Sequence, residues 1–226
     1  MKHSFIAIIC FFAIPPCNSQ DQVGKSIADH LLIKAADKDR YGEPEEETIG
    51  SPYLEDIFIS GAVHTFNESY NDLPMRYNIY SDYIEFKQNG QIFILDPEPR
   101  LKSVHLGDKT FVVLKHEFKG KWKHGYLELL DTGKALLLVK KTMLYHESQP
   151  AKALESSATP AKYTRMPDIY FYKIGSGEVA KVGNIKNLIE RFPDKHAELT
   201  EFSKREKLGV KQEADLKKLF NYYNSL

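Results

Sequence analysis

Residues 76–95 read RYNIYSDYIEFKQNGQIFIL, and this stretch decides the fold. Apolar and polar residues alternate over residues 83–87 and 91–95, as they do in strands that bury one face. Asn89-Gly90 separates these two runs. An Asn-Gly pair favours the two-residue type I′ turn, because both central residues of that turn need a positive φ. The stretch therefore predicts an antiparallel hairpin.

The alternating pattern continues to Tyr145. Residues 110–118 read TFVVLKHEF and residues 125–145 read GYLELLDTGKALLLVKKTMLY, with a turn predicted at Thr132-Gly133. Within the second run, residues 136–139 are all apolar, which is typical of a central strand that is buried on both faces. These runs predict an antiparallel meander.

The end of the meander is less regular. Residues 147–163 have few apolar side chains and two prolines, which predicts a long loop that serves as a mobile flap. A last hairpin is expected, with strands at residues 168–174 and 178–182 around the turn Gly175-Ser176-Gly177.

Helical patterns flank the strand patterns. Apolar residues recur at helical spacing in residues 185–192, 195–207 and 212–223, and residues 22–40 show a weaker helical face. The predicted fold is α+β: a curved antiparallel sheet of about eight to ten strands, folded into a sandwich or half-barrel. An N-terminal helix and three C-terminal helices are expected to cover this sheet.

The first residues have the features of a leader for export. A basic start precedes the apolar run at residues 5–14, which is too short to span a bilayer. Pro15-Pro16 ends the run, and small residues follow up to Ser19, so we expect cleavage after Ser19 or Gln20. Lipidation of Cys17 is the weaker alternative, because proline precedes that cysteine where small residues are usual.

The chain then divides into four parts. They are a signal peptide (1–19), a helix with an acidic linker (20–51), an antiparallel β domain (52–183) and a helical cap (184–226). Both cysteines, Cys10 and Cys17, lie in the leader, so the mature chain is expected to lack a thiol nucleophile or thiolate ligand. No transmembrane segment is expected in the mature chain.

The composition excludes some classes of partner. Lysine plus arginine equals aspartate plus glutamate, at 31 each, so the formal net charge is zero. A chain without excess positive charge is not expected to bind nucleic acid.

Catalytic and metal signatures are missing from the sequence. His116 and His124 flank a basic loop, but their spacing is not that of a helical zinc pair. Ser176 lies directly between two glycines, which is a hairpin pattern and not a nucleophile elbow. We therefore predict no catalytic residue, no metal site and no cofactor.

Aromatic residues are the predicted binding residues, because an apolar ring with a polar tip suits sugars, lipid head groups and proteins. Three tyrosines cluster at the first hairpin, and two more share one face of a late strand, where they point outward or into a second cavity if Ile169 and Phe171 point to the core. The alternative is that these tyrosines only form cross-strand pairs that stabilise the sheet. The candidates are Tyr77, Tyr80, Tyr83, Trp122, Tyr170 and Tyr172.

Three stretches carry a resemblance to a known group of proteins. They are Gly50-Ser51-Pro52-Tyr53-Leu54, Met75-Arg76-Tyr77-Asn78-Ile79-Tyr80, and the tail from Glu213-Ala214-Asp215-Leu216 to Tyr222-Tyr223-Asn224-Ser225-Leu226. Over nearly all of the mature chain, the sequence resembles a family of exported Gram-negative envelope proteins with no assigned activity. The resemblance implies an envelope location and supplies no catalytic residue.

Three hypotheses for function follow. The first is an exported, non-enzymatic binding or interaction module of the periplasm or the exterior, whose partner is an envelope protein, a glycan or a lipid. The second is a carrier that holds a lipid or another hydrophobic ligand between the sheet and its helices, with residues 147–163 as a lid. The third is a hydrolase whose site is assembled from dispersed residues.

Overall fold

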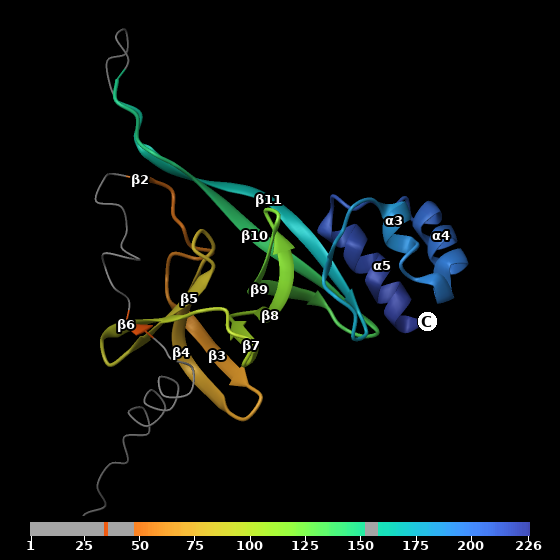
Figure 1. The fold of residues 1–226 in the computed structure, drawn as a ribbon, viewed down its shortest axis with the longest axis horizontal. Helices are drawn as coiled ribbons and strands as arrows, with labels where there is room; N and C mark the ends of the chain where they lie inside the picture. Colours follow the sequence, from red (N-terminus) through yellow and green to blue (C-terminus); the bar gives the residue numbers. More distant parts are fainter. Residues whose placement is uncertain (1–33, 36–47, 152–157) are drawn as a thin grey trace, which may run out of the picture.

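The computed structural model describes residues 34–35, 48–151 and 158–226. Twelve strands form one sheet, and helices follow at the C-terminal end (Figure 1). The strands are β1 (Lys34–Ala35), β2 (Thr48–Ile49), β3 (Ile59–Thr65), β4 (Ser69–Asn78), β5 (Tyr83–Gln88), β6 (Gln91–Leu95), β7 (Leu101–Leu106), β8 (Lys109–Phe118), β9 (Lys121–Asp131), β10 (Ala135–His146), β11 (Ala161–Ile174) and β12 (Ala180–Lys181). The helices are α3 (Ile185–Ile189), the 3-10 helix η1 (Pro193–Lys195), α4 (His196–Arg205) and α5 (Glu213–Ser225).

From β3 to β12 the sheet is a meander in which consecutive strands are neighbours, except that β7 pairs with β3 and not with β6. Its order is β1-β6-β5-β4-β3-β7-β8-β9-β10-β11-β12, and neighbours along this path are antiparallel. The short β2 lies off the path and pairs in parallel with the start of β11, so the sheet is mixed. The α+β class and a curved sheet followed by C-terminal helices are thus confirmed, whereas the sheet is open, mixed and larger than the eight to ten antiparallel strands expected.

Three clusters of buried side chains hold the sheet and the helices together. The first lies among β3 to β9 and includes Met75, Phe86 and Phe111. The second lies between the β10–β11 hairpin and the helices, and the third lies on the other face of this hairpin. The β10–β11 hairpin runs diagonally across Figure 1, with α3, α4 and α5 beside one of its ends.

The predicted turns are confirmed by the backbone. Asn89 and Gly90 have φ values of 49° and 75°, as a type I′ turn requires. The strand β10 follows the turn at Thr132-Gly133 and pairs with β9 on one side and β11 on the other. Its role as a central strand is also confirmed, since Leu137 and Leu138 are fully buried in different clusters.

The C-terminal helices follow the predicted segments closely. The side chain of Asn184 accepts a hydrogen bond from the backbone N–H of Asn187 at 2.9 Å, so it caps α3. An aspartate after a proline, as in Pro193-Asp194, can cap a helix that follows, but here Asp194 lies inside η1. This 3-10 turn carries the chain into α4 without a side-chain cap.

The predicted boundaries of the last strands are wrong. The strand β11 begins at Ala161, inside the expected loop, and pairs with β10 over almost its whole length. Polar residues in its first half occupy strand positions because β10 offers a complete ladder of backbone partners. The expected last strand of the sheet shortens to the two residues of β12.

The predicted N-terminal helix lies mostly outside the described residues, as do the leader and residues 152–157 of the expected lid. At residues 34–35 the structure has the strand β1, which pairs with β6, where a helix was expected. The backbone N–H and C=O groups on that edge of β6 need hydrogen-bonding partners, and the strand β1 supplies them.

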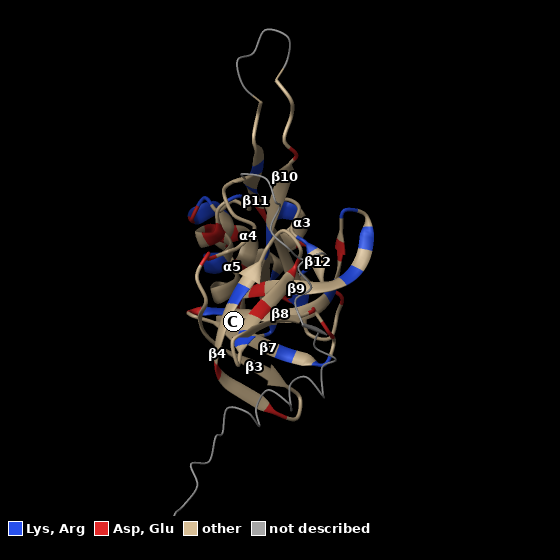
Figure 2. Ribbon diagram, turned by 90° about the vertical axis from the view of Figure 1, so that its left-hand side faces the viewer, with Lys and Arg blue, Asp and Glu red and all other residues tan. Residues whose placement is uncertain are grey.

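Charges of both signs occur on the sheet and on the helices. Lys and Arg residues lie among Asp and Glu residues in both parts (Figure 2). Within the part of the chain that is described, every helix is too short or too polar to cross a bilayer.

Candidate functional site

An apolar groove of about 820 Å³ lies between the end of the β8–β9 hairpin and the β10–β11 hairpin. Its apolar lining includes Trp122 from β9, Met143 and Leu144 from β10, and Ile169 and Phe171 from β11. The segment that leads into β12 closes one side with Val179 and Ala180. The volume is that of a typical site for a small ligand.

Large apolar side chains stay open to solvent in this groove. Trp122 is 51% exposed, Leu144 is 41% exposed and Met166 is 40% exposed. Leu144 and Met166 lie close to one another on the paired strands β10 and β11, where Leu144 pairs with Thr164. Folding has therefore left part of the hydrophobic lining of the groove uncovered.

The β8–β9 hairpin brings positive charge to the groove. Its turn is formed by Lys119 and Gly120, whose φ values of 51° and 75° again fit a type I′ turn. Lys119 lines the groove beside Phe118 and Glu117. Lys123 follows on β9 and donates a hydrogen bond to Asp82 at 3.1 Å.

A buried polar centre joins three parts of the sheet behind this groove. The ammonium group of Lys140 on β10 forms an ion pair with Asp82, which follows β4. It also donates to the hydroxyl of Tyr77 at 3.2 Å and to the backbone carbonyl of Tyr126 at 3.0 Å. Lys140 is only 2% exposed, so the contacts of this centre stabilise the packing of the sheet and do not face a substrate.

Each charge in this centre has a shifted pKa. Burial lowers the pKa of Lys140 to about 8 and outweighs the opposing effect of Asp82. Burial alone would raise the pKa of Asp82, but the ammonium groups of Lys140 and Lys123 hold it below its usual value. The hydroxyl of Tyr77 donates to Asp82 at 2.8 Å, and burial raises the pKa of Tyr77.

His116 lies next to this centre and is completely buried. Its Nδ1 lies 2.9 Å from the carbonyl oxygen of Leu114, and a neutral ring donates its proton there. Its Nε2 has no hydrogen-bond partner among the described residues. Burial lowers the pKa of His116, so the ring is neutral at pH 7.

A tight contact holds His116 and Asp82 in place. Both lie against Gly125 on β9, where an added Cβ would stand 2.7 Å from Oδ2 of Asp82 and 2.9 Å from Cε1 of His116. Only glycine leaves room for both side chains at this position.

A second polar cluster lies on the outer face of β4 and β5. Arg76 donates to the carboxylate of Glu85 at 2.7 Å and to the hydroxyl of Tyr53 at 2.7 Å, and that hydroxyl donates to Glu85 at 3.0 Å. Nearby, Asn78 donates to the hydroxyl of Tyr83 at 3.1 Å. These bonds fix the chain before β3 onto the sheet, so the cluster has a structural role.

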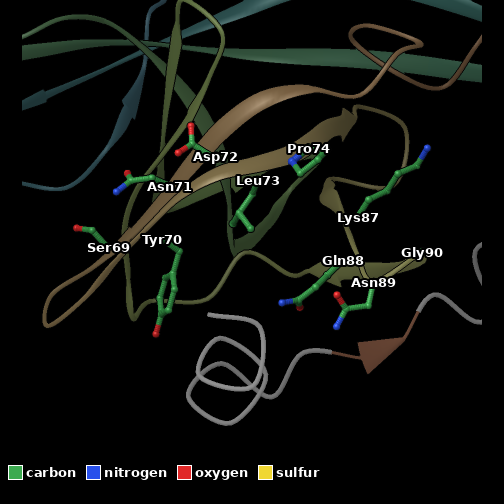
Figure 3. Close-up of a pocket in the computed structure, with 10 residues that line it drawn as sticks. All are labelled: Ser69, Tyr70, Asn71, Asp72, Leu73, Pro74, Lys87, Gln88, Asn89 and Gly90. Carbon is green, nitrogen blue, oxygen red and sulfur yellow. The ribbon is translucent and has the colours of Figure 1, made fainter. Parts of the chain in front are cut away.

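Another concave region, of about 620 Å³, lies between β4 and the β5–β6 turn (Figure 3). Its lining mixes apolar side chains with polar ones, among them Asn71, Asp72, Gln88 and Asn89. Gln88 and Asn89 already have partners, so their polar groups are not free for a ligand.

The structure separates the six predicted binding residues. Tyr77 and Tyr83 are buried in the polar clusters described above, and Tyr80 is 48% exposed. Tyr80 instead forms an aromatic group with Tyr145 and Tyr163, at ring distances of 6.0 and 5.4 Å.

The expected aromatic face on β11 is corrected by the structure. Tyr172 is buried beneath the C-terminal helices, and Tyr170 packs against the same cluster. Ile169 and Phe171 point to the other face of the strand, where both line the groove. Among the six predicted residues, Trp122 alone lines the groove.

Sequence reasoning missed most of the groove. Met143, Leu144 and Met166 read as ordinary strand residues, since apolar side chains on a long strand predict a core. The one available signal was the tryptophan on a lysine-rich turn, because turns seldom present such a large apolar side chain without a partner.

Comparisons with known proteins give this chain no relative. A scan against protein-family models, a search of curated proteins and a search of solved structures each found no match. The likeness to an exported envelope family therefore stays a prediction, and the argument for function rests on the geometry of the groove.

Proposed function

We propose that this protein is an exported, non-enzymatic binding protein of the cell envelope, and that the groove beside Trp122 takes an apolar ligand. The signal peptide predicted at residues 1–19 supports the location. Lipidation at Cys17 is the alternative form of the same proposal. We interpret the curved sheet of β3 to β9 as a half-barrel whose interior is filled by side chains of the first cluster, which leaves the groove as the ligand site.

The observation that carries the proposal is the apolar lining that stays exposed. Each Å² of apolar surface left in water costs about 25 cal/mol relative to burial. Proteins rarely keep a large contiguous patch of this kind unless it binds something. Trp122, Leu144 and Met166 contribute such a surface to one groove of ligand size.

The charged groups favour binding over catalysis. Lys140, Asp82 and His116 have the shifted pKa values often found in active sites, but they are buried and already bonded to one another or packed. The described residues that line the groove include no histidine, cysteine or serine. A hydrolase would need a nucleophile or an activated water in reach of a base at this surface.

The test uses Trp122 as a reporter, because it is the only tryptophan in the chain. A neutral apolar fluorophore is titrated into the mature protein while the emission of Trp122 is followed. We expect saturable quenching or energy transfer, and Leu144→Asp is expected to abolish it because a carboxylate in the groove is costly to desolvate.

Phe66→Asp is the matched control, because Phe66 is 73% exposed in the turn between β3 and β4, away from the groove. This variant is expected to bind like the wild type. Equal binding by all three proteins, or no saturable binding by the wild type, would disprove a ligand site in this groove. Mass spectrometry of the protein from its own envelope fraction reports the mature N-terminus and so tests the location.

A further inference from the structure

Positive charge is concentrated in the hairpin that forms one wall of the groove. Residues 115–124 read KHEFKGKWKH, with four lysines and one glutamate, so this segment has a formal charge of +3 in a chain with a net charge of zero. The segment covers the end of β8, the turn and the start of β9. In Figure 1 the tip of this hairpin lies beside the β10–β11 hairpin.

Two of these lysines gather at one groove-lining ring. The Nζ of Lys119 lies 5.4 Å from the ring centroid of Phe118, and the Nζ of Lys123 lies 5.0 Å from it. Phe118 itself lines the groove. Cation–π contacts of this kind hold ammonium groups close to an apolar surface.

Two lysines at the tip form no ion pair with a carboxylate of the described chain. Lys123 is paired with Asp82, but neither Lys119 nor Lys121 makes an ion pair with a described residue. At the opposite side of the groove, Lys181 and Glu178 balance one another in formal charge. The wall at the β8–β9 turn carries Lys119 and Lys121 without an ion pair against one carboxylate, Glu117, so it is the more positive side of the groove.

We propose that the ligand of this groove is a single-chain amphiphile with an anionic head, a carboxylate or a phosphate. Its chain lies against Trp122, Leu144 and Met166, and its head lies at the turn beside Lys119 and Lys121. The inference rests on the proposed function, because it assigns the chemistry of the ligand for the same groove.

The experiment compares four probes that share a twelve-carbon chain: dodecanoate, dodecyl phosphate, dodecyl phosphocholine and dodecyl maltoside. Each is titrated below its micelle concentration into the full mature protein, with Trp122 emission as the signal. We expect the two anionic probes to bind about tenfold more tightly than the maltoside, as two exposed charge contacts allow. The two anionic arms distinguish a carboxylate head from a phosphate head.

The contribution of the lysines is tested by Lys119→Gln combined with Lys121→Gln. This variant is expected to bind the anionic probes as weakly as the maltoside, while its affinity for the maltoside is unchanged. Raising the salt from 50 to 500 mM is expected to weaken only the anionic probes, because salt screens exposed charges. Lys211→Gln combined with Lys218→Gln changes the net charge equally on the helical side and is expected to bind like the wild type.

The outcomes separate the inference from the proposed function. If all four probes bind equally, or if both double variants lose affinity equally, the anionic head is wrong and the apolar groove stands. If no probe binds, the proposed function fails as well.

Discussion

The two faces of the β10–β11 hairpin carry similar apolar side chains, but they differ in how completely they are buried. On one face, Leu137 and Tyr172 lie beneath the helices and pack against residues such as Phe220. On the other face, Leu138 and Phe171 are buried, but the same hairpin then continues into the exposed Leu144 and Met166. The protein itself covers one face, whereas the other face contains an open groove.

This difference shows how ordinary strand residues leave an uncovered apolar surface on the molecule. Alternation places apolar side chains on both faces of a central strand, which would normally require two covering layers. The helices provide a cover for one face, and the β8–β9 hairpin with β12 covers only part of the other. The surface without a cover is the one that we assign to a ligand.

The largest contrast is expected between matched truncations on the two faces. Phe220→Ala on the covered face removes a fully buried ring and is expected to lower the free energy of unfolding by about 3–5 kcal/mol. Leu144→Ala on the groove face is expected to lower it by less than about 1 kcal/mol, because much of that side chain is already in water. Urea unfolding measures both, and similar losses would contradict the distinction between a sealed and an open face.

The next effect concerns the buried polar centre formed by Lys140 and Asp82. Asp82→Asn leaves the ammonium of Lys140 without its carboxylate and is expected to lower the free energy of unfolding by about 3 kcal/mol. Adding Lys140→Met to this variant is expected to restore part of the loss, since no buried charge then remains.

The control for this polar centre is Asp108→Asn, which removes an exposed carboxylate from its ion pair with Lys109 and is expected to leave the urea midpoint unchanged. If Asp82→Asn is equally harmless, the pair with Lys140 does not hold these parts of the sheet together.

A smaller effect is expected where the last helix is fastened to the covered face. The side chain of Asn224 accepts a hydrogen bond from the N–H of Ala135 at 3.0 Å and donates to the carbonyl of Thr132 at 3.2 Å. It also donates to the carbonyl of Ala135 at 3.1 Å. Asn224→Ala removes all three bonds and is expected to cost about 1–2 kcal/mol. Asn221→Ala, at an exposed position of α5, should cost much less, and faster amide exchange of α5 in the first variant alone would support this role.

The smallest effect is a dependence of stability on pH. The pKa of His116 is lowered by burial, so below about pH 6.5 the unfolded chain binds a proton that the folded protein excludes. The free energy of unfolding therefore falls as the pH falls from 7.5 to 5.5. His116→Gln is expected to reduce this loss, whereas His124→Gln, at an exposed position, is expected to keep the wild-type slope. Identical slopes in all three proteins would show that His116 is not the buried neutral group.

Local chemistry explains why much of the architecture was predictable. Asn89-Gly90 specified its hairpin, and Asn184 specified the start of α3, because turns and caps depend on a few neighbouring residues. The extent of β11 was not predictable. Its polar first half pairs with β10 through backbone groups, and its side chains show no strand pattern that would indicate this pairing.

Of the six binding residues predicted from the sequence, only Trp122 lines the groove that we propose as the site. Tyr77 and Tyr172 looked like binding residues because an isolated strand does not show which of its faces will be covered. Their positions depend on Lys140, on Asp82 and on the C-terminal helices, which are distant in sequence. Lys140 and Asp82, for example, are 58 residues apart.

By itself, the sequence determined the strand and helix patterns, the two-residue turns, the balance of charge and the lysine-rich hairpin. These follow from periodicity, from the φ values that Asn and Gly tolerate, and from composition. The tertiary structure alone decided which apolar face is sealed and which is open, and that Lys140 meets Asp82 in the interior. Burial is a property of surfaces brought together from distant parts of the chain, and no local pattern fixes which surfaces will meet.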